Sequence, residues 1–131
     1  MKELIRYQWP AVTWAVIVLI LCDLPPSSFK KAPVFEGIDK LVHTGFFFVL
    51  TVLLFHGKIR QQKSYSWSIS TILKIVLFTG LFGGGIELLQ WKVFTYRSAE
   101  WWDLFADMTG VGMAVFSYIL LHRPAFYEKR N

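Results

Sequence analysis

Apolar residues occur along the chain in long blocks, and they do not follow the regular spacing of an amphipathic helix or strand. A helix that crosses a membrane needs about 20 predominantly apolar residues. Four blocks approach this length, and they predict membrane spans at residues 9–24, 39–55, 69–90 and 101–122. The pattern therefore predicts an all-α integral membrane protein, a bundle of four transmembrane helices that forms a single domain over residues 1–131.

Prolines and polar clusters set the expected limits of two spans. The first span is expected to begin near Trp9, which puts Pro10 in the first helical turn, where a missing backbone N–H does no harm. Pro25 and Pro26 end that span. A loop is expected over residues 56–68, because this segment is rich in Lys, Arg and Gln.

The composition agrees with this class of protein. Hydrophobic residues make up 54% of the chain, which is more than in an average soluble domain. Charged residues make up 18%, which is less than in such a domain. The formal net charge is +5, but the basic residues form no stripe that could follow a phosphate backbone, so no nucleic-acid partner is expected. The single cysteine, Cys22, excludes an internal disulfide.

The distribution of charges predicts the orientation of the bundle, because Lys and Arg gather near cytoplasmic span ends. With the N-terminus inside, nine of them lie on the inner side: Lys2, Arg6, Lys58, Arg60, Lys63, Lys74, Arg123, Lys129 and Arg130. Five lie outside: Lys30, Lys31, Lys40, Lys92 and Arg97. Both termini are therefore expected to be cytoplasmic. Acidic residues show the opposite distribution, since only Glu3 and Glu128 fall inside.

Polar residues gather at three span ends that share the outer side of this predicted bundle. They occur there in pairs at i, i+3 or i, i+4, a spacing that puts both members on one helix face. Ionisable residues within membrane spans are functional candidates by default. The sequence therefore predicts a polar pocket formed by Asp39, Lys40, His43, Glu87, Gln90, Arg97, Asp103 and Asp107.

A purely structural interpretation of these residues stays open. Asp39 can be a helix cap, and Asp103 can be a first-turn acid that the helix dipole favours. Glu87 and Asp107 are harder to explain in this way, because apolar residues flank them and a buried carboxylate must be paired or protonated. Arg97, whose guanidinium fork matches a carboxylate, is the expected partner of Glu87.

Small residues predict where two spans pack closely. Gly80 and Gly84 form a G-x-x-x-G pair in the third span. Ala106, Gly110 and Ala114 recur at every fourth position in the fourth span. Because small residues let helix backbones approach each other, these two stripes are expected to pack together.

The order of the polar residues resembles that of the VanZ-like family of bacterial envelope proteins, associated with resistance to the glycopeptide teicoplanin. The matching pattern is D-K-x-x-H from Asp39 to His43, E-x-x-Q from Glu87 to Gln90, then Arg97, Asp103 and Gly110. The chain departs from the family at Asp107, where Asn is usual, and at Ala114, where Gly is usual. The resemblance implies a multi-pass protein of the bacterial cytoplasmic (inner) membrane and no particular reaction.

The first functional hypothesis is a binding protein of the outer leaflet. Its pocket would hold an anionic lipid or a cell-wall-related head group, with donors from Lys40, His43 and Arg97 and with aromatic side chains over the acyl chain. The partners expected from this hypothesis are membrane lipids and a lipid-linked cell-wall precursor or a glycopeptide.

Two other functions stay open. One is an intramembrane enzyme that acts on a lipid-linked phosphate ester, by acid/base chemistry or with a divalent metal bound by His43, Glu87, Asp103 and Asp107. The chain contains neither G-x-S-x-G nor H-E-x-x-H, so no nucleophile is evident. The other is an ion-coupled transporter, ranked last because no inverted repeat is visible. A homodimer would partly meet that objection.

Overall fold

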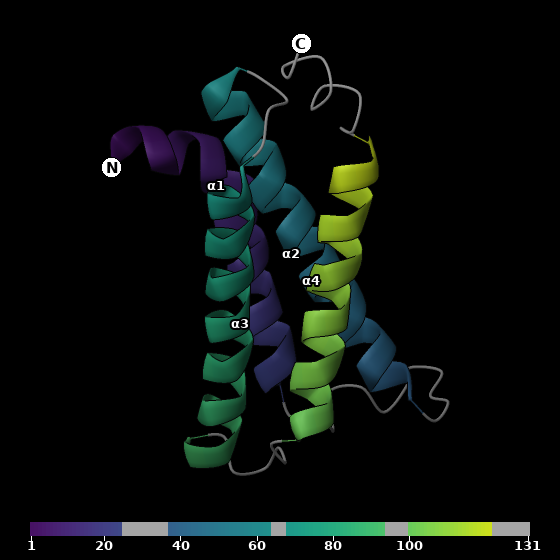
Figure 1. Cartoon of the computed structure of the whole chain (residues 1–131). Helices are drawn as coiled ribbons and strands as arrows, with labels where there is room; N and C mark the ends of the chain where they lie inside the picture. The colour runs from purple at the N-terminus through teal and green to yellow at the C-terminus, as the bar shows by residue number, and fades with distance from the viewer. Residues whose placement is uncertain (25–36, 64–67, 94–99, 122–131) are drawn as a thin grey trace.

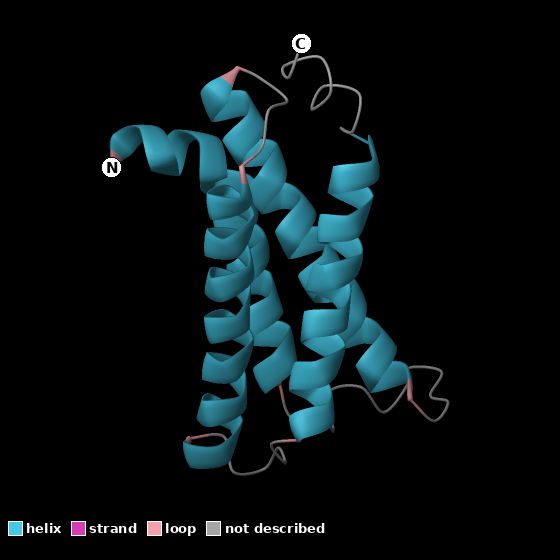
Figure 2. Ribbon diagram, viewed as in Figure 1, coloured by secondary structure: helices cyan, strands magenta, loops and turns pink. Residues whose placement is uncertain are grey.

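The protein is a bundle of four long helices that run alternately up and down (Figure 1, Figure 2). The computed structural model describes residues 1–24, 37–63, 68–93 and 100–121. The helices are α1 (Lys2–Asp23), α2 (Ile38–Gln62), α3 (Ile69–Lys92) and α4 (Trp101–Leu121). Each helix is long and apolar enough to cross a membrane. The predicted class, an all-α multi-pass membrane bundle, is therefore confirmed.

Large apolar side chains cover the outside of the bundle. Leu81 on α3 is 69% exposed, and Phe105 and Phe116 on α4 are 65% and 64% exposed. Contiguous apolar surface of this kind is unusual on a soluble monomer. In a membrane these side chains contact the lipid chains, so all four helices are in contact with lipid.

Helix α2 continues past residue 55, the predicted end of the second span, as far as Gln62. Most of the loop expected over residues 56–68 is therefore helical. Lys, Arg and Gln form helices readily, so a polar composition alone does not mark a loop. The helix ends at Lys63, which takes the left-handed conformation with φ 53°.

Helix α1 begins at Lys2, before the predicted start of the first span at residue 9, so Pro10 lies inside the helix and not in its first turn. A proline inside a helix lacks the N–H donor, and its ring clashes with the carbonyl four residues earlier, so the helix bends. Figure 1 shows the N-terminal part of α1 turned away from the rest of the helix and projecting sideways from the bundle.

The bent part of α1 is anchored on α2. Gln8 Nε2 donates a hydrogen bond of 3.2 Å to the carbonyl oxygen of Leu54. The backbone of Tyr7 lies so close to Gly57 that a Cβ there would be 2.7 Å from the Tyr7 carbonyl oxygen. The absence of a side chain at Gly57 thus lets the backbone of α1 pack directly on α2. This close contact explains a glycine within an otherwise helix-forming segment.

Helices α2 and α4 approach each other closely at Gly110. A Cβ on Gly110 would overlap the carbonyl oxygen of Thr44 and would lie 3.0 Å from the Phe48 nitrogen. Thr44 Oγ1 donates a hydrogen bond of 3.1 Å to the Ala106 carbonyl oxygen across the same contact. Further along the two helices, the rings of Phe55 and Tyr118 stack at 4.2 Å.

The two small-residue stripes do not pack on each other as expected, because Gly110 faces α2 instead of α3. On α3, a Cβ at Gly80 would lie 3.6 Å from the Met108 sulfur, while a Cβ at Gly84 would have nothing within 4 Å. Gly83 makes the close contact instead, since its Cβ would lie 3.0 Å from Asp107 Oδ2. The glycine of α3 that packs closely on α4 is thus Gly83, one position before the expected Gly84.

The contact at Gly110 generates a stability prediction with a control two residues away. Gly110→Ala is expected to lower the free energy of unfolding by about 1–3 kcal/mol, because the new methyl group overpacks the α2–α4 contact. Gly112 has open space around it, so Gly112→Ala is expected to stay within about 0.5 kcal/mol of the parent protein. Equilibrium unfolding in mixed micelles of mild detergent and dodecyl sulfate measures both. Equal losses in the two variants would contradict this packing.

Candidate functional site

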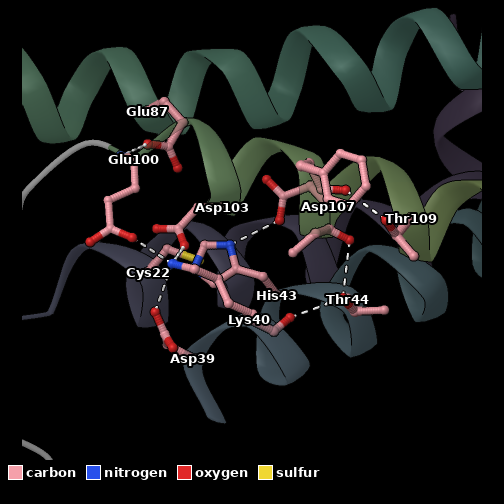
Figure 3. Close-up of polar contacts among 12 residues, drawn as sticks. Cys22, Asp39, Lys40, His43, Thr44, Glu87, Glu100, Asp103, Asp107 and Thr109 are labelled. Atoms are coloured by element: carbon pink, nitrogen blue, oxygen red, sulfur yellow. Dashed lines mark hydrogen bonds and ion pairs between the residues drawn. The ribbon is translucent and has the colours of Figure 1, made fainter. Parts of the chain in front are cut away.

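Three helix ends meet at one end of the bundle and bring polar residues from distant parts of the sequence together (Figure 3). They are the start of α2, the end of α3 and the start of α4. Because neighbouring helices alternate in direction, these ends lie at similar depth. The described residues of the predicted pocket are placed there, and Arg97 lies outside the described residues.

Lys40 holds the outer part of this site together. Its ammonium group donates to Asp39 Oδ2 at 2.9 Å, to Glu100 Oε2 at 2.6 Å and to Asp103 Oδ1. An ammonium group has three N–H donors, and each of the three meets a different carboxylate. Asp39 and Glu100 are exposed, whereas Asp103 is 5% exposed. Lys40 therefore balances one buried acid and leaves the cluster with an excess of negative charge.

His43 and Asp107 form a second, deeper pair. His43 Nδ1 lies 2.8 Å from Asp107 Oδ1, and both residues are buried. The other carboxylate oxygen, Asp107 Oδ2, points at Gly83 and has no hydrogen-bond partner among the described residues. A buried carboxylate needs a partner or a proton, and His43 supplies the partner for one oxygen only.

Glu100 connects α3 to α2. Its backbone N–H donates a hydrogen bond of 2.9 Å to Glu87 Oε2, while its side chain accepts from Lys40. The pocket predicted from the sequence did not include Glu100. Its position immediately before α4 was the available signal, because an acid next to a helix N-terminus is favoured and cannot lie far from Asp103.

Gln90 does not contact the acids of the predicted pocket, and Thr44 is a contact residue that the sequence did not indicate. Gln90 is buried, but its amide nitrogen donates to the Cys22 carbonyl oxygen at 2.9 Å, so it joins α3 to the end of α1 and not to the acids. Thr44 was absent from the predicted pocket, although it lies one turn after Lys40 and donates to that residue's carbonyl oxygen at 2.9 Å.

The carboxylates that gather most closely are not the predicted metal ligands. Asp39, Glu100 and Asp103 offer oxygens within 4.8 Å of one another, and only Asp103 belongs to the predicted set of His43, Glu87, Asp103 and Asp107. The ammonium of Lys40 is bonded to all three acids. Among the described residues, the donor set thus fits an ion-pair cluster around an ammonium better than a divalent metal centre.

A cavity of about 510 Å³ lies between α3 and α4 beside this cluster. Its lining consists of four large apolar or aromatic side chains, one glycine and two acids: Leu88, Trp91, Trp101, Leu104, Gly84, Glu87 and Glu100. The buried oxygen Glu87 Oε1 has no partner among the described residues. His43 and Asp107 do not belong to the lining, so the acids that face the cavity are Glu87 and Glu100.

Comparison of the chain with protein families, curated proteins and solved structures finds no match. The class of the protein therefore rests on its own fold and site. It is a multi-pass helical membrane protein with a lysine-centred acidic cluster and an adjoining, mostly apolar cavity at one end of the bundle.

The cluster predicts strong coupling between Lys40 and Asp103. Lys40→Gln is expected to lower the free energy of unfolding by about 1–3 kcal/mol, because it leaves the buried Asp103 carboxylate without its charged donor. The double variant Lys40→Gln/Asp103→Asn is expected to recover at least about 0.5 kcal/mol of that loss. Equilibrium unfolding of the parent protein, both single variants and the double variant measures the coupling.

Lys92→Gln is the matched control, because Lys92 is exposed and forms no ion pair among the described contacts. It is expected to remain within about 0.5 kcal/mol of the parent protein. Strictly additive losses at Lys40 and Asp103 would show that the cluster does not depend on this contact.

Proposed function

We propose that the protein is an envelope protein of the bacterial cytoplasmic membrane, of the VanZ-like type, and that its cavity binds the head group of a lipid-linked, cell-wall-related molecule. The observation that carries this proposal is the lining of the α3–α4 cavity. Trp91, Trp101 and two leucines suit an acyl or polyprenyl chain, and Glu87 and Glu100 suit a polar head. Both kinds of contact occur within one site beside surrounding lipid.

The described charges indicate which part of a head group meets the cavity. All three N–H donors of the Lys40 ammonium group are bonded to carboxylates, so none is left for a ligand. Both ionisable residues in the cavity lining are acids. Carboxylates accept hydrogen bonds and repel phosphate. The group next to Glu87 and Glu100 therefore carries O–H or N–H donors, as a sugar or an amine does. The sequence led us to expect an anionic lipid or cell-wall-related head group with donors from Lys40, His43 and Arg97, and Arg97 lies outside the described residues.

The charge distribution supports an extracytoplasmic position for this site. Among the described residues, the end that holds the cluster contains Lys40 and Lys92 and six acids, and the opposite end contains six of the basic residues and Glu3. Lys and Arg are enriched on the cytoplasmic side. Both termini then face the cytoplasm, and the cavity faces the side on which glycopeptides act and cell-wall precursors are displayed.

A second candidate function is acid/base catalysis on a lipid-linked phosphate ester. The buried pair of His43 and Asp107 favours it, since a carboxylate on Nδ1 orients an imidazole to exchange protons at Nε2. We rank it second because neither residue belongs to the cavity lining. Turnover of such an ester that disappears in Asp107→Asn, with the fold retained, would establish this function in place of simple binding.

The cavity supplies a test with a matched pair of glycines. A Cβ at Gly84 or at Gly85 would meet no atom within 4 Å, but only Gly84 belongs to the lining. Gly84→Leu is therefore expected to fill the cavity without unfolding the bundle and to weaken binding at least about tenfold, equivalent to about 1.4 kcal/mol. Gly85→Leu is expected to bind within about twofold of the parent protein.

The measurement is native mass spectrometry of the purified protein with a polyprenyl-diphosphate-linked amino sugar as the probe. Polyprenyl diphosphate without the sugar is the control ligand and is expected to bind more weakly, because it carries the same phosphates but offers no donor to Glu87 and Glu100. Absence of binding to the parent protein would refute the proposal. Equal binding by Gly84→Leu and the parent protein would place the ligand elsewhere.

A further inference from the structure

The N-terminal part of α1 is the one helical segment, within the described part of the chain, that leaves the direction of the bundle. Pro10 lies inside the helix, and Figure 1 shows the N-terminal part of α1 projecting sideways from the bundle, steeply inclined to the rest of the helix. It projects at the end opposite to the acidic cluster. A helix that projects sideways at one end of a membrane bundle lies along the membrane surface, at the level of the lipid head groups, and not across the hydrocarbon.

The side chains of this segment are arranged as in a helix that lies on a membrane surface. Lys2 and Arg6 are four residues apart and share one face, and Ile5 and Trp9 share the neighbouring face. All four are exposed, and Ile5 and Trp9 keep 59% and 58% of their surface accessible. Tryptophan and basic residues beside apolar ones are characteristic of the membrane–water interface.

The opposite side of the segment is attached to the protein, so this exposed surface has a defined direction. Gln8 is bonded to the Leu54 carbonyl oxygen, and Tyr7 lies against Gly57. Contacts on this side leave Lys2 and Arg6 directed away from α2. The surface is therefore presented by a fixed contact between α1 and α2, and not by a free chain end.

The charge of the surrounding end strengthens the same surface. The described basic residues at this end are Lys2, Arg6, Lys58, Arg60, Lys63 and Lys74, and Glu3 is the acid among them. Each Lys or Arg near an anionic membrane surface adds to its attraction for the protein. A group of negatively charged head groups in one leaflet complements this end of the bundle.

We infer that residues 2–9 form an interfacial helix that binds anionic phospholipid head groups, with Lys2 and Arg6 on the phosphates and Ile5 and Trp9 between the upper acyl chains. The basic ends of α2 and α3 enlarge the same lipid-binding surface. This inference does not depend on the ligand proposed for the α3–α4 cavity, since the two sites lie at opposite ends of the bundle.

The test compares phosphatidylglycerol with phosphatidylcholine of identical acyl chains, by native mass spectrometry of the full chain released from mixed-lipid nanodiscs. The parent protein is expected to retain phosphatidylglycerol preferentially, and added salt is expected to reduce this preference because it screens exposed charges. Arg6→Gln is expected to reduce the preference about fivefold, and Lys2→Gln/Arg6→Gln about 25-fold.

Two control variants distinguish binding by the interfacial helix from a general effect of net charge. Lys92→Gln removes one exposed charge at the opposite end and is expected to leave the preference within about twofold. Arg6→Lys keeps the charge but changes the contact of the guanidinium with the Tyr7 ring, whose centroid lies 5.9 Å away, and is expected to retain the preference. No preference in the parent protein, or equal losses in Arg6→Gln and Lys92→Gln, would overturn the inference.

Discussion

The shared contact of Lys40 with three carboxylates is the interaction on which the site depends. A buried charge without a partner is strongly unfavourable, and this is most severe where hydrocarbon surrounds the bundle. Lys40 supplies the partner for Asp103 and draws Glu100 into the same cluster. The backbone of Glu100 then bonds to Glu87. One ammonium group thus fixes the start of α2 against the start of α4, and Glu100 extends the connection to α3.

This cluster requires that α2 and α4 come close together. Within lipid, helices do not associate through the hydrophobic effect, so close backbone packing and interhelical hydrogen bonds have to bring them together. Gly110 and Thr44 meet both requirements at the same point. Thr44 directly follows His43, and Gly110 lies three residues after Asp107, so this contact is next to the buried pair of His43 and Asp107. The steric contact therefore sets the rotation of the two helices, and that rotation decides which polar groups meet.

The two ends of the bundle differ in charge and in shape, and each difference has a separate consequence. At one end, excess acid lies beside a mostly apolar cavity, where we propose that a ligand with a lipid tail and hydrogen-bond donors binds. At the other end lie a bent helix and several basic side chains, where we infer that anionic lipid binds. The same bilayer thus meets two chemically distinct surfaces of one small protein, and this asymmetry is itself a basis for a defined orientation in the membrane.

The sequence by itself determined the class of the protein, because membrane-length apolar blocks are a local property of the chain. It placed the starts of α3 and α4 correctly, and it identified most of the residues at the polar end. It could not show that Pro10 lies within α1, or that α2 extends to Gln62, because neighbouring helices support these segments. The tertiary structure alone decided that Lys40 meets Asp103, that His43 meets Asp107 and that Gln90 turns toward Cys22. Spacing along a helix fixes which residues share a face, but the rotation of each helix about its axis depends on close contacts such as Gly110 with Thr44.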